Sequence, residues 1–216
     1  GADVVNEDFT EAAVNTPEAA RALDLWGTMV REGWAASTST GSDPNDERFG
    51  NEQAAMFVSG YWVWGWIAES YPELLPDIGV APIPAPDEGD ELATVYGGWT
   101  VMAYAGTEHP EAAAEFAINL FGAEDNTRAA EWGMVYNTKL SPRQSVVDEN
   151  PEFYGEFPHN VFANDIFPTA RAEPSYPPEI GQSVWEALQS VMFLDVPAED
   201  AASMWAETID SYLATR

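Results

Sequence analysis

The sequence predicts an α/β fold with a buried core, and one observation supports each part of this prediction. Segments with apolar residues at helical spacing alternate with extended segments rich in proline and glycine. The apolar share is 45% over 216 residues, which is enough to bury a core and excludes global disorder. No apolar run approaches the ~20 residues of a membrane-spanning helix. The length fits one large domain or two small lobes.

The first predicted helix begins at Thr16-Pro17-Glu18, where a capping hydroxyl precedes a proline and an acid. We expect it to end at Gly33. Four apolar residues lie on it at helical spacing: Ala19, Leu23, Trp26 and Val30. Residues 37–51 are rich in small and polar side chains and predict a surface loop.

The middle of the chain predicts short, mixed elements. Residues 51–57 predict a short helix that continues into a strand at 56–58, and residues 60–67 predict a turn followed by the start of a helix. The three prolines within 78–86 predict an extended segment, because they forbid a helix there. An acidic turn at 87–91 follows, and then a predicted strand at 95–105.

The second half of the chain predicts helices. Pro110 opens a helix whose apolar face holds Ala113, Phe116, Ala117 and Leu120, and residues 125–132 predict another short helix. Residues 137–178 contain seven prolines and predict irregular chain with short helices. Two clear helices close the chain. Their apolar stripes are Ile180, Val184, Leu188, Val191 and Met192, and then Ala201, Ala202, Trp205, Ile209 and Tyr212.

Charge excludes several classes of partner. Thirty-seven acidic residues face eight basic ones, which gives a net charge of −29. Nucleic acid is therefore excluded as a partner, as is anionic lipid, since both need clustered Lys and Arg. Lys139 is the only lysine. We expect a salt-adapted protein whose self-repulsion is screened in about 1 M salt; the alternative is an acidic secreted protein.

No motif predicts catalysis, a metal site or a cofactor. The chain has no cysteine and two histidines that are far apart. The acidic stretch 43–47 begins like a calcium loop, but Arg48 stands where that loop needs glycine and Ala54 where it needs glutamate. Paired carboxylates of a glycosidase stay possible in so acidic a chain.

The aromatic residues predict a binding site. Tyr61, Trp62, Trp64 and Trp66 lie within six residues, with Gly60 just before the cluster and Gly65 within it. An exposed indole ring suits the apolar C–H face of a sugar, whose hydroxyls then bind acidic and amide side chains. The alternative for each ring is ordinary core packing.

Three further candidates lie elsewhere in the sequence. Trp99 follows Tyr96-Gly97-Gly98, where glycine lets the backbone come close to a partner or take positive φ; the alternative is a bulged strand. Trp185 lies at the edge of its helix's apolar stripe, and Tyr176 stands among stiff prolines just before that helix. For both, packing is the alternative. The predicted ligand-binding residues are Trp62, Trp99, Trp185, Tyr176, Tyr61, Trp64 and Gly98.

Five segments resemble one family, in the family's order. Residues 51–62 (NEQAAMFVSGYW) resemble the G-x-A-A-M-x-x-x-G-P-W signature of family 1 extracellular solute-binding proteins of ABC importers, the maltodextrin-binding-like group. Tyr61 stands where proline is usual. The other four segments are 79–86, similar to G-V-A-P-x-P; 97–99, similar to G-G-W; 111–121; and the closing helices in 174–212.

The resemblance implies a type II periplasmic-binding-protein-like fold. It implies mainly the C-terminal lobe, residues 1–92 and 142–216, plus a segment at 93–141 that would return to the N-terminal lobe. Family members are longer and begin with a leader and a first lobe, so we expect this chain to be the C-terminal half. The missing N-terminal lobe of the same protein would then be a partner.

The resemblance also implies a function without catalysis or cofactor. We expect an extracellular or periplasmic carbohydrate-binding component of an ABC importer, with permease subunits as partners and a lipoprotein anchor on a leader outside this chain. The family's sugar-stacking ring maps to Trp62, and Trp99 and Trp185 match further cleft positions. The alternatives are a non-sugar solute such as a polyamine, a peptide or glycerol phosphate, and a glycoside hydrolase with two carboxylates.

Overall fold

The structure is a computed structural model that describes residues 3–36 and 45–216, with the side chains of residues 45 and 46 left undescribed. By its internal contacts the chain divides into a terminal unit, Gly1–Ser42 with Pro174–Arg216, and a central unit, Asp43–Glu173. Most of the predicted loop at 37–51, including the start of its acidic stretch, lies outside the described residues.

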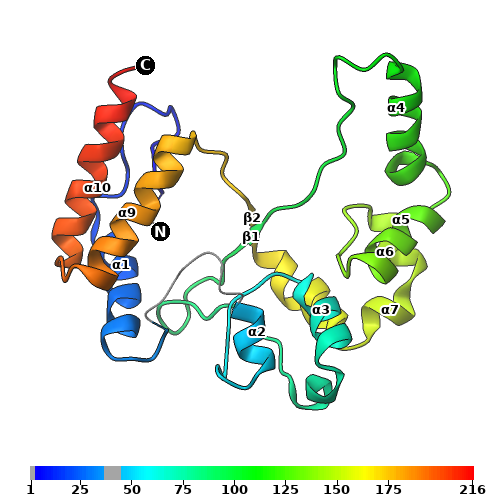
Figure 1. Cartoon of the computed structure of the whole chain (residues 1–216), viewed down its shortest axis with the longest axis horizontal. Helices are drawn as coiled ribbons and strands as arrows, with labels where there is room; N and C mark the ends of the chain where they lie inside the picture. The colour runs from blue at the N-terminus through cyan, green and yellow to red at the C-terminus, as the bar shows by residue number, and fades with distance from the viewer. Residues whose placement is uncertain (1–2, 37–44) are drawn as a thin grey trace. The chain divides into compact units, whose positions relative to one another are not determined.

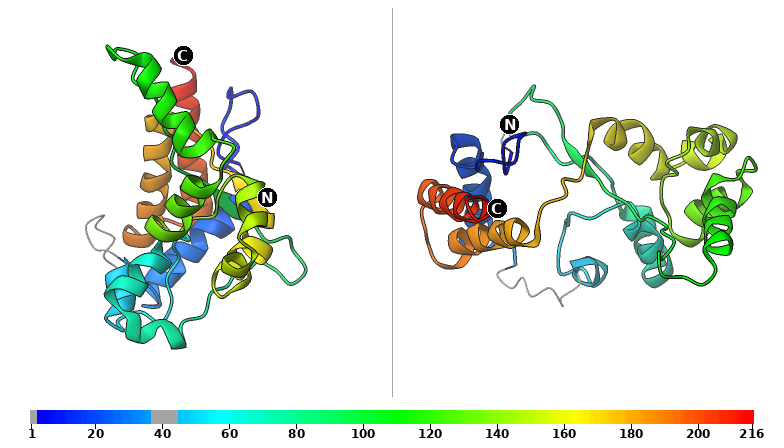
Figure 2. Two further views of the ribbon diagram at one scale, coloured as in Figure 1. Left: turned by 90° about the vertical axis from the view of Figure 1, so that its right-hand side faces the viewer. Right: turned by 90° about the horizontal axis from the view of Figure 1, so that it is seen from above.

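The terminal unit is built on three helices, α1 (Pro17–Arg31), α9 (Pro178–Phe193) and α10 (Ala198–Leu213). All three pairs of these helices are in contact, and they lie side by side in both sets of views (Figures 1 and 2). The predicted helices in these regions are confirmed. The buried residues form two clusters, whose largest members are Val14, Leu23, Ile180, Val191 and Ile209.

The start of α1 follows from its sequence, whereas its buried face differs from the prediction. The hydroxyl of Thr16 accepts a hydrogen bond from the backbone N–H of Ala19, which caps the helix. The buried residues of α1 continue from Leu23 to Gly27 and not to Trp26, which was predicted on that face and is 47% exposed. A Cβ at Gly27 would lie 3.0 Å from the carbonyl oxygen of Val191, so α1 and α9 approach too closely there for a larger side chain.

The first part of the central unit contains α2 (Asn45–Gly50), α3 (Val63–Ser70) and a 3₁₀ helix, Pro72–Asp77. The predicted turn and helix start at 60–67 is confirmed. The prediction at 51–58 is wrong, because the helix lies earlier and ends at Gly50, and no strand forms at 56–58. The same helix shows that the loop predicted at 37–51 is wrong over residues 45–50. Met56 is 85% exposed, and a strand needs a neighbour to take its backbone hydrogen bonds.

Two short strands pair in parallel in the central unit: β1 (Thr94–Tyr96) and β2 (Ala170–Ala172), with Val95 opposite Arg171. The strand predicted at 95–105 is therefore mostly wrong. The pairing stops at Tyr96, and within the described chain no other segment pairs with the residues that follow it. Most of their side chains, including the large ones of Trp99, Met102 and Tyr104, are exposed.

Helices fill the rest of the central unit, as predicted. They are α4 (Pro110–Ala117), α5 (Thr127–Glu131), α6 (Gln144–Glu149), α7 (Pro151–Gly155) and α8 (His159–Val161), joined by π-helical and 3₁₀ turns. Ala129, Ala130 and Val146 form a small core between α5 and α6. No helix among residues 3–36 and 45–216 is long and apolar enough to cross a membrane.

Candidate functional site

Trp62 stands at the start of α3, with its indole folded back over the chain. It is the N-cap residue of that helix and is 57% exposed. A Cβ at Gly60 would collide with the six-membered ring of Trp62, so this ring position requires glycine at residue 60. The local sequence Gly60-Tyr61-Trp62 therefore holds one large aromatic face open to solvent.

Trp99 lies just beyond β1 and is 81% exposed. The backbone N–H of Glu173, at the end of β2, donates to the carbonyl of Tyr96 at 2.9 Å. A Cβ at Gly97 would meet the carboxylate of Glu173, whereas Gly98 faces open space. Gly97 thus lets the chain pass close to Glu173, and the exposed Trp99 follows two residues later.

Lys139 brings the two indoles together. Its ammonium nitrogen lies 5.8 Å from the centroid of Trp62 and 5.2 Å from that of Trp99, both within cation–π distance. The backbone N–H of Lys139 donates to Gly133 at 2.8 Å, and the neighbouring Thr138 has a φ of 44°. Burial lowers the pKa of Lys139. Trp62, Trp99 and Lys139 are hereafter called the indole–lysine site.

Tyr61 and Trp64, two further predicted ligand-binding residues, pack against other rings. Tyr61 is 6% exposed, and its ring stacks on Phe162 with centroids 4.4 Å apart. Trp64 is partly buried and meets Phe157 edge to face, with centroids 5.6 Å apart. The structure thus places both rings in contact with other aromatic rings, and their contact with a ligand stays a prediction.

Trp185 and Tyr176 belong to the terminal unit, whereas Trp62 and Trp99 belong to the central unit. Trp185 lies on α9 and is 55% exposed. Tyr176 packs against the core cluster of Val5, Val14 and Ile180, and burial raises its pKa. A ligand role for either residue stays a prediction.

A buried polar contact supports the backbone of the indole–lysine site. The hydroxyl of Tyr61 is hydrogen-bonded to Nδ1 of His159. Burial raises the pKa of Tyr61, so its hydroxyl keeps its proton and can donate it to a neutral imidazole. Burial also lowers the pKa of His159, while the Glu156 carboxylate acts in the opposite direction.

We expect acid to destabilise the fold through His159. In the unfolded chain the imidazole has its ordinary pKa of 6.5, so below that pH the unfolded state binds more protons than the folded state. The stability that neutral His159 supplies is therefore complete above pH 6.5 and is lost as the pH falls toward the lowered folded pKa. Thermal melts from about pH 7.5 to about pH 5 measure this loss.

His159→Gln keeps an acceptor for Tyr61 and removes the titration, so its melting temperature is expected to fall less over the same pH range. The matched control is His109→Gln, since the side chain of His109 is exposed. Equal pH slopes for the wild type and His159→Gln would contradict this role.

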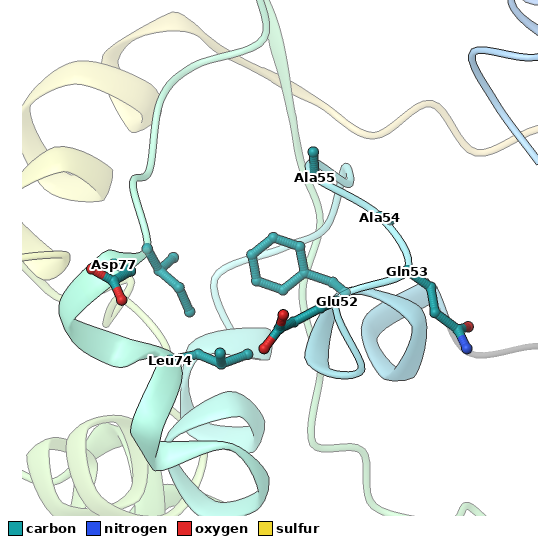
Figure 3. A pocket seen from close by; sticks show the side chains of 8 residues that line it. Glu52, Gln53, Ala54, Ala55, Leu74 and Asp77 are labelled. Atoms are coloured by element: carbon teal, nitrogen blue, oxygen red, sulfur yellow. The ribbon is translucent and has the colours of Figure 1, made fainter.

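The central unit also has an open hollow of about 350 Å³. Glu52 and Ala55, from the segment after α2, face Leu74 and Asp77 of the 3₁₀ helix across it (Figure 3). None of the predicted ligand-binding residues lines it. No group of three metal-ligating side chains occurs in the part of the chain that the structure describes.

Sequence reasoning did not predict a place for Lys139 in the site. The available signal was its status as the single lysine in a strongly acidic chain. Its position depends on the π-helical segment Trp132–Tyr136 and the residues that follow it, whose course no local motif predicted. Thr138 shows the same dependence, since its hydroxyl lies against Gly65 of α3.

The fold is that of type II periplasmic solute-binding proteins. A solute-binding protein from Thermotoga lettingae, solved with α-D-tagatose bound, matches 99% of this chain with a TM-score of 0.84 at 21% identity. The maltose-bound MalE3 of T. maritima matches 100% with a TM-score of 0.78 at 20% identity. The sugar-binding protein MalE of Xanthomonas citri matches 99% with a TM-score of 0.77 at 21% identity. The predicted fold class is therefore confirmed.

The chain belongs to the family described as bacterial extracellular solute-binding protein, which matches residues 1–127. A probable ABC transporter-binding protein of Deinococcus radiodurans is 26% identical over 184 residues, which are 83% of this chain and 43% of the relative. The chain spans about half the length of the solved structures, 53% to 54% of each. The family binds solutes and is not enzymatic, which agrees with the absence of a predicted catalytic site.

Proposed function

We propose that this chain is part of an extracellular carbohydrate-binding protein that delivers its ligand to the permease subunits of an ABC importer. Family membership supports the solute-binding role. The observation that supports a sugar is the indole–lysine site, where two exposed indole rings and one ammonium group meet. A lipoprotein anchor and the division into lobes, with 1–92 and 142–216 in one and 93–141 in the other, belong to the same proposal.

The chemistry of the site fits a sugar ring. An indole face buries the apolar C–H face of a pyranose, and the area removed from water stabilises the complex. The ammonium group of Lys139 carries three N–H donors and can bind ring hydroxyls that the indoles leave free. Gly98, which faces open space, keeps the backbone beside Trp99 accessible to the same ligand.

Lys139 also bears on the non-sugar alternatives. A polyamine would bring further positive charge to a site that already holds an ammonium group, which is unfavourable. An anionic solute such as glycerol phosphate would instead be attracted by the positive charge of Lys139. Glycerol phosphate is therefore the second candidate, and the measurement below includes it.

Intrinsic tryptophan fluorescence in molar salt tests the proposal. The panel holds maltose, longer glucans, xylo- and galacto-oligosaccharides, trehalose, spermidine and glycerol phosphate. We expect a saturable change with one sugar class, because Trp62 and Trp99 would be covered on binding. Saturable binding of spermidine alone, with no response to any saccharide, would contradict the proposal.

A further inference from the structure

Lys139 has an unusual position for a cation in this protein. The chain holds 37 acidic residues, yet no carboxylate of the described residues forms an ion pair with its only lysine. Other cations have structural partners. Arg31 pairs with Asp24 at 3.3 Å, and Arg143 donates to the backbone carbonyls of Phe121 and Ala123. The positive charge of Lys139 therefore stays available.

The surroundings of Lys139 are aromatic and partly desolvated. The ammonium lies over the rings of Trp62 and Trp99, and it is partly buried. Ring faces attract a cation but accept no conventional hydrogen bond in the way that an oxygen does. An anionic oxygen that reached the site would therefore meet a cation with N–H donors beside two indole rings.

We infer that the indole–lysine site selects saccharides that carry a carboxylate, such as uronic acids, with Lys139 binding the carboxylate while Trp62 and Trp99 bind the ring. This inference rests on the proposed carbohydrate function. The overall charge of −29 repels an acidic ligand from the surface as a whole, so binding of such a ligand would depend on its direct contact with Lys139. Molar salt screens that long-range repulsion to within ~3 Å, whereas a direct, partly desolvated ion pair is screened much less.

A single lysine also favours a carboxylate over a phosphate. A phosphate carries more charge and is usually held by several donors, such as arginine forks or the N-terminus of a helix. The structure places one ammonium group and two indoles here. One positive charge matches one carboxylate, and the indoles supply the ring contact that a small phosphate ester lacks.

Paired titrations test the inference on the protein in its full natural length, in molar KCl. Digalacturonate is compared with its neutral counterpart galactobiose, and glycerol phosphate is added as the phosphate arm. We expect digalacturonate to bind about tenfold more tightly than galactobiose, as for a hydrogen bond to a charged group. In Lys139→Met the ratio of the two Kd values should fall to about one, and Lys139→Arg should restore part of it.

Arg128→Met is the matched control, since it removes one exposed cation from the same unit and should leave the ratio unchanged. A second readout is acetylation of Lys139, followed by peptide mass spectrometry. Digalacturonate should slow this reaction more than galactobiose does at equal occupancy. Circular dichroism confirms that each variant is folded.

The outcomes separate this inference from the proposed function. Equal Kd values for the acidic and neutral sugars, or a preference that survives in Lys139→Met, would overturn the inference and leave carbohydrate binding intact. Tight binding of glycerol phosphate without binding of digalacturonate would overturn it in favour of the phosphate solute. A folded protein that binds no saccharide, acidic or neutral, would overturn both.

Discussion

Trp62→Ala is expected to weaken sugar binding about thirtyfold. Covering one face of an indole removes ~100 Å² of apolar surface from water, which contributes about 2 kcal/mol, and that free energy corresponds to a factor of about thirty in Kd. Because Trp62 is 57% exposed, its loss should cost the fold little. Calorimetric titration in molar salt, with the sugar that the fluorescence panel identifies, measures the change.

Trp26→Ala is the matched control for this variant. Trp26 is also a half-exposed indole, but it lies on α1 in the terminal unit and has no predicted ligand role. Its Kd should stay within about twofold of the wild type. If Trp62→Ala, folded by circular dichroism, also stayed within that range, Trp62 would not be the stacking ring.

The melting temperature is expected to rise on the order of 10 °C between low salt and about 2 M KCl. Eight cations cannot neutralise 37 acidic side chains, so the folded chain repels itself. Salt shortens the range of that repulsion from ~30 Å at 0.01 M to ~3 Å at 1 M. Differential scanning calorimetry at a series of KCl concentrations follows the effect.

A charge variant separates screening from other effects of salt. Glu199 and Glu207 are exposed on α10, and replacing both with glutamine should raise the melting temperature in low salt and reduce its dependence on salt. Sucrose at matched osmolality serves as the uncharged control. A melting temperature that is flat from low to molar salt would favour the alternative of an ordinary acidic secreted protein.

Local chemistry was sufficient to predict most of the helices, with α2 as an exception. The start of α1 is determined by Thr16 and Pro17, and α4 begins at Pro110, so a sequence rule is enough there. The strands were predicted poorly, because a strand depends on a partner elsewhere in the chain. The residues at 97–105 have the composition of a strand, but the described chain pairs only Thr94–Tyr96 with β2.

The site was predictable in its aromatic members and not in their arrangement. Flanking glycines marked both Trp62 and Trp99 as unusual, and both are exposed in the structure. Their meeting at Lys139 depends on a loop far along the sequence, which no periodicity encodes. Trp26 is an aromatic residue whose position was predicted wrongly. Its helical spacing predicted burial, but α1 approaches α9 closely at Gly27, and Trp26 is exposed.

The packing of α1 against α9 and α10 imposes an order on folding during synthesis. α1 is made before the central unit, but its buried face stays uncovered until α9 and α10, which follow the central unit, have been made. The whole central unit emerges in between and can begin to fold first. During that interval the apolar face of α1, including Leu23, lacks its native helix partners, and exposed apolar surface of this kind is prone to aggregation until α10 is complete.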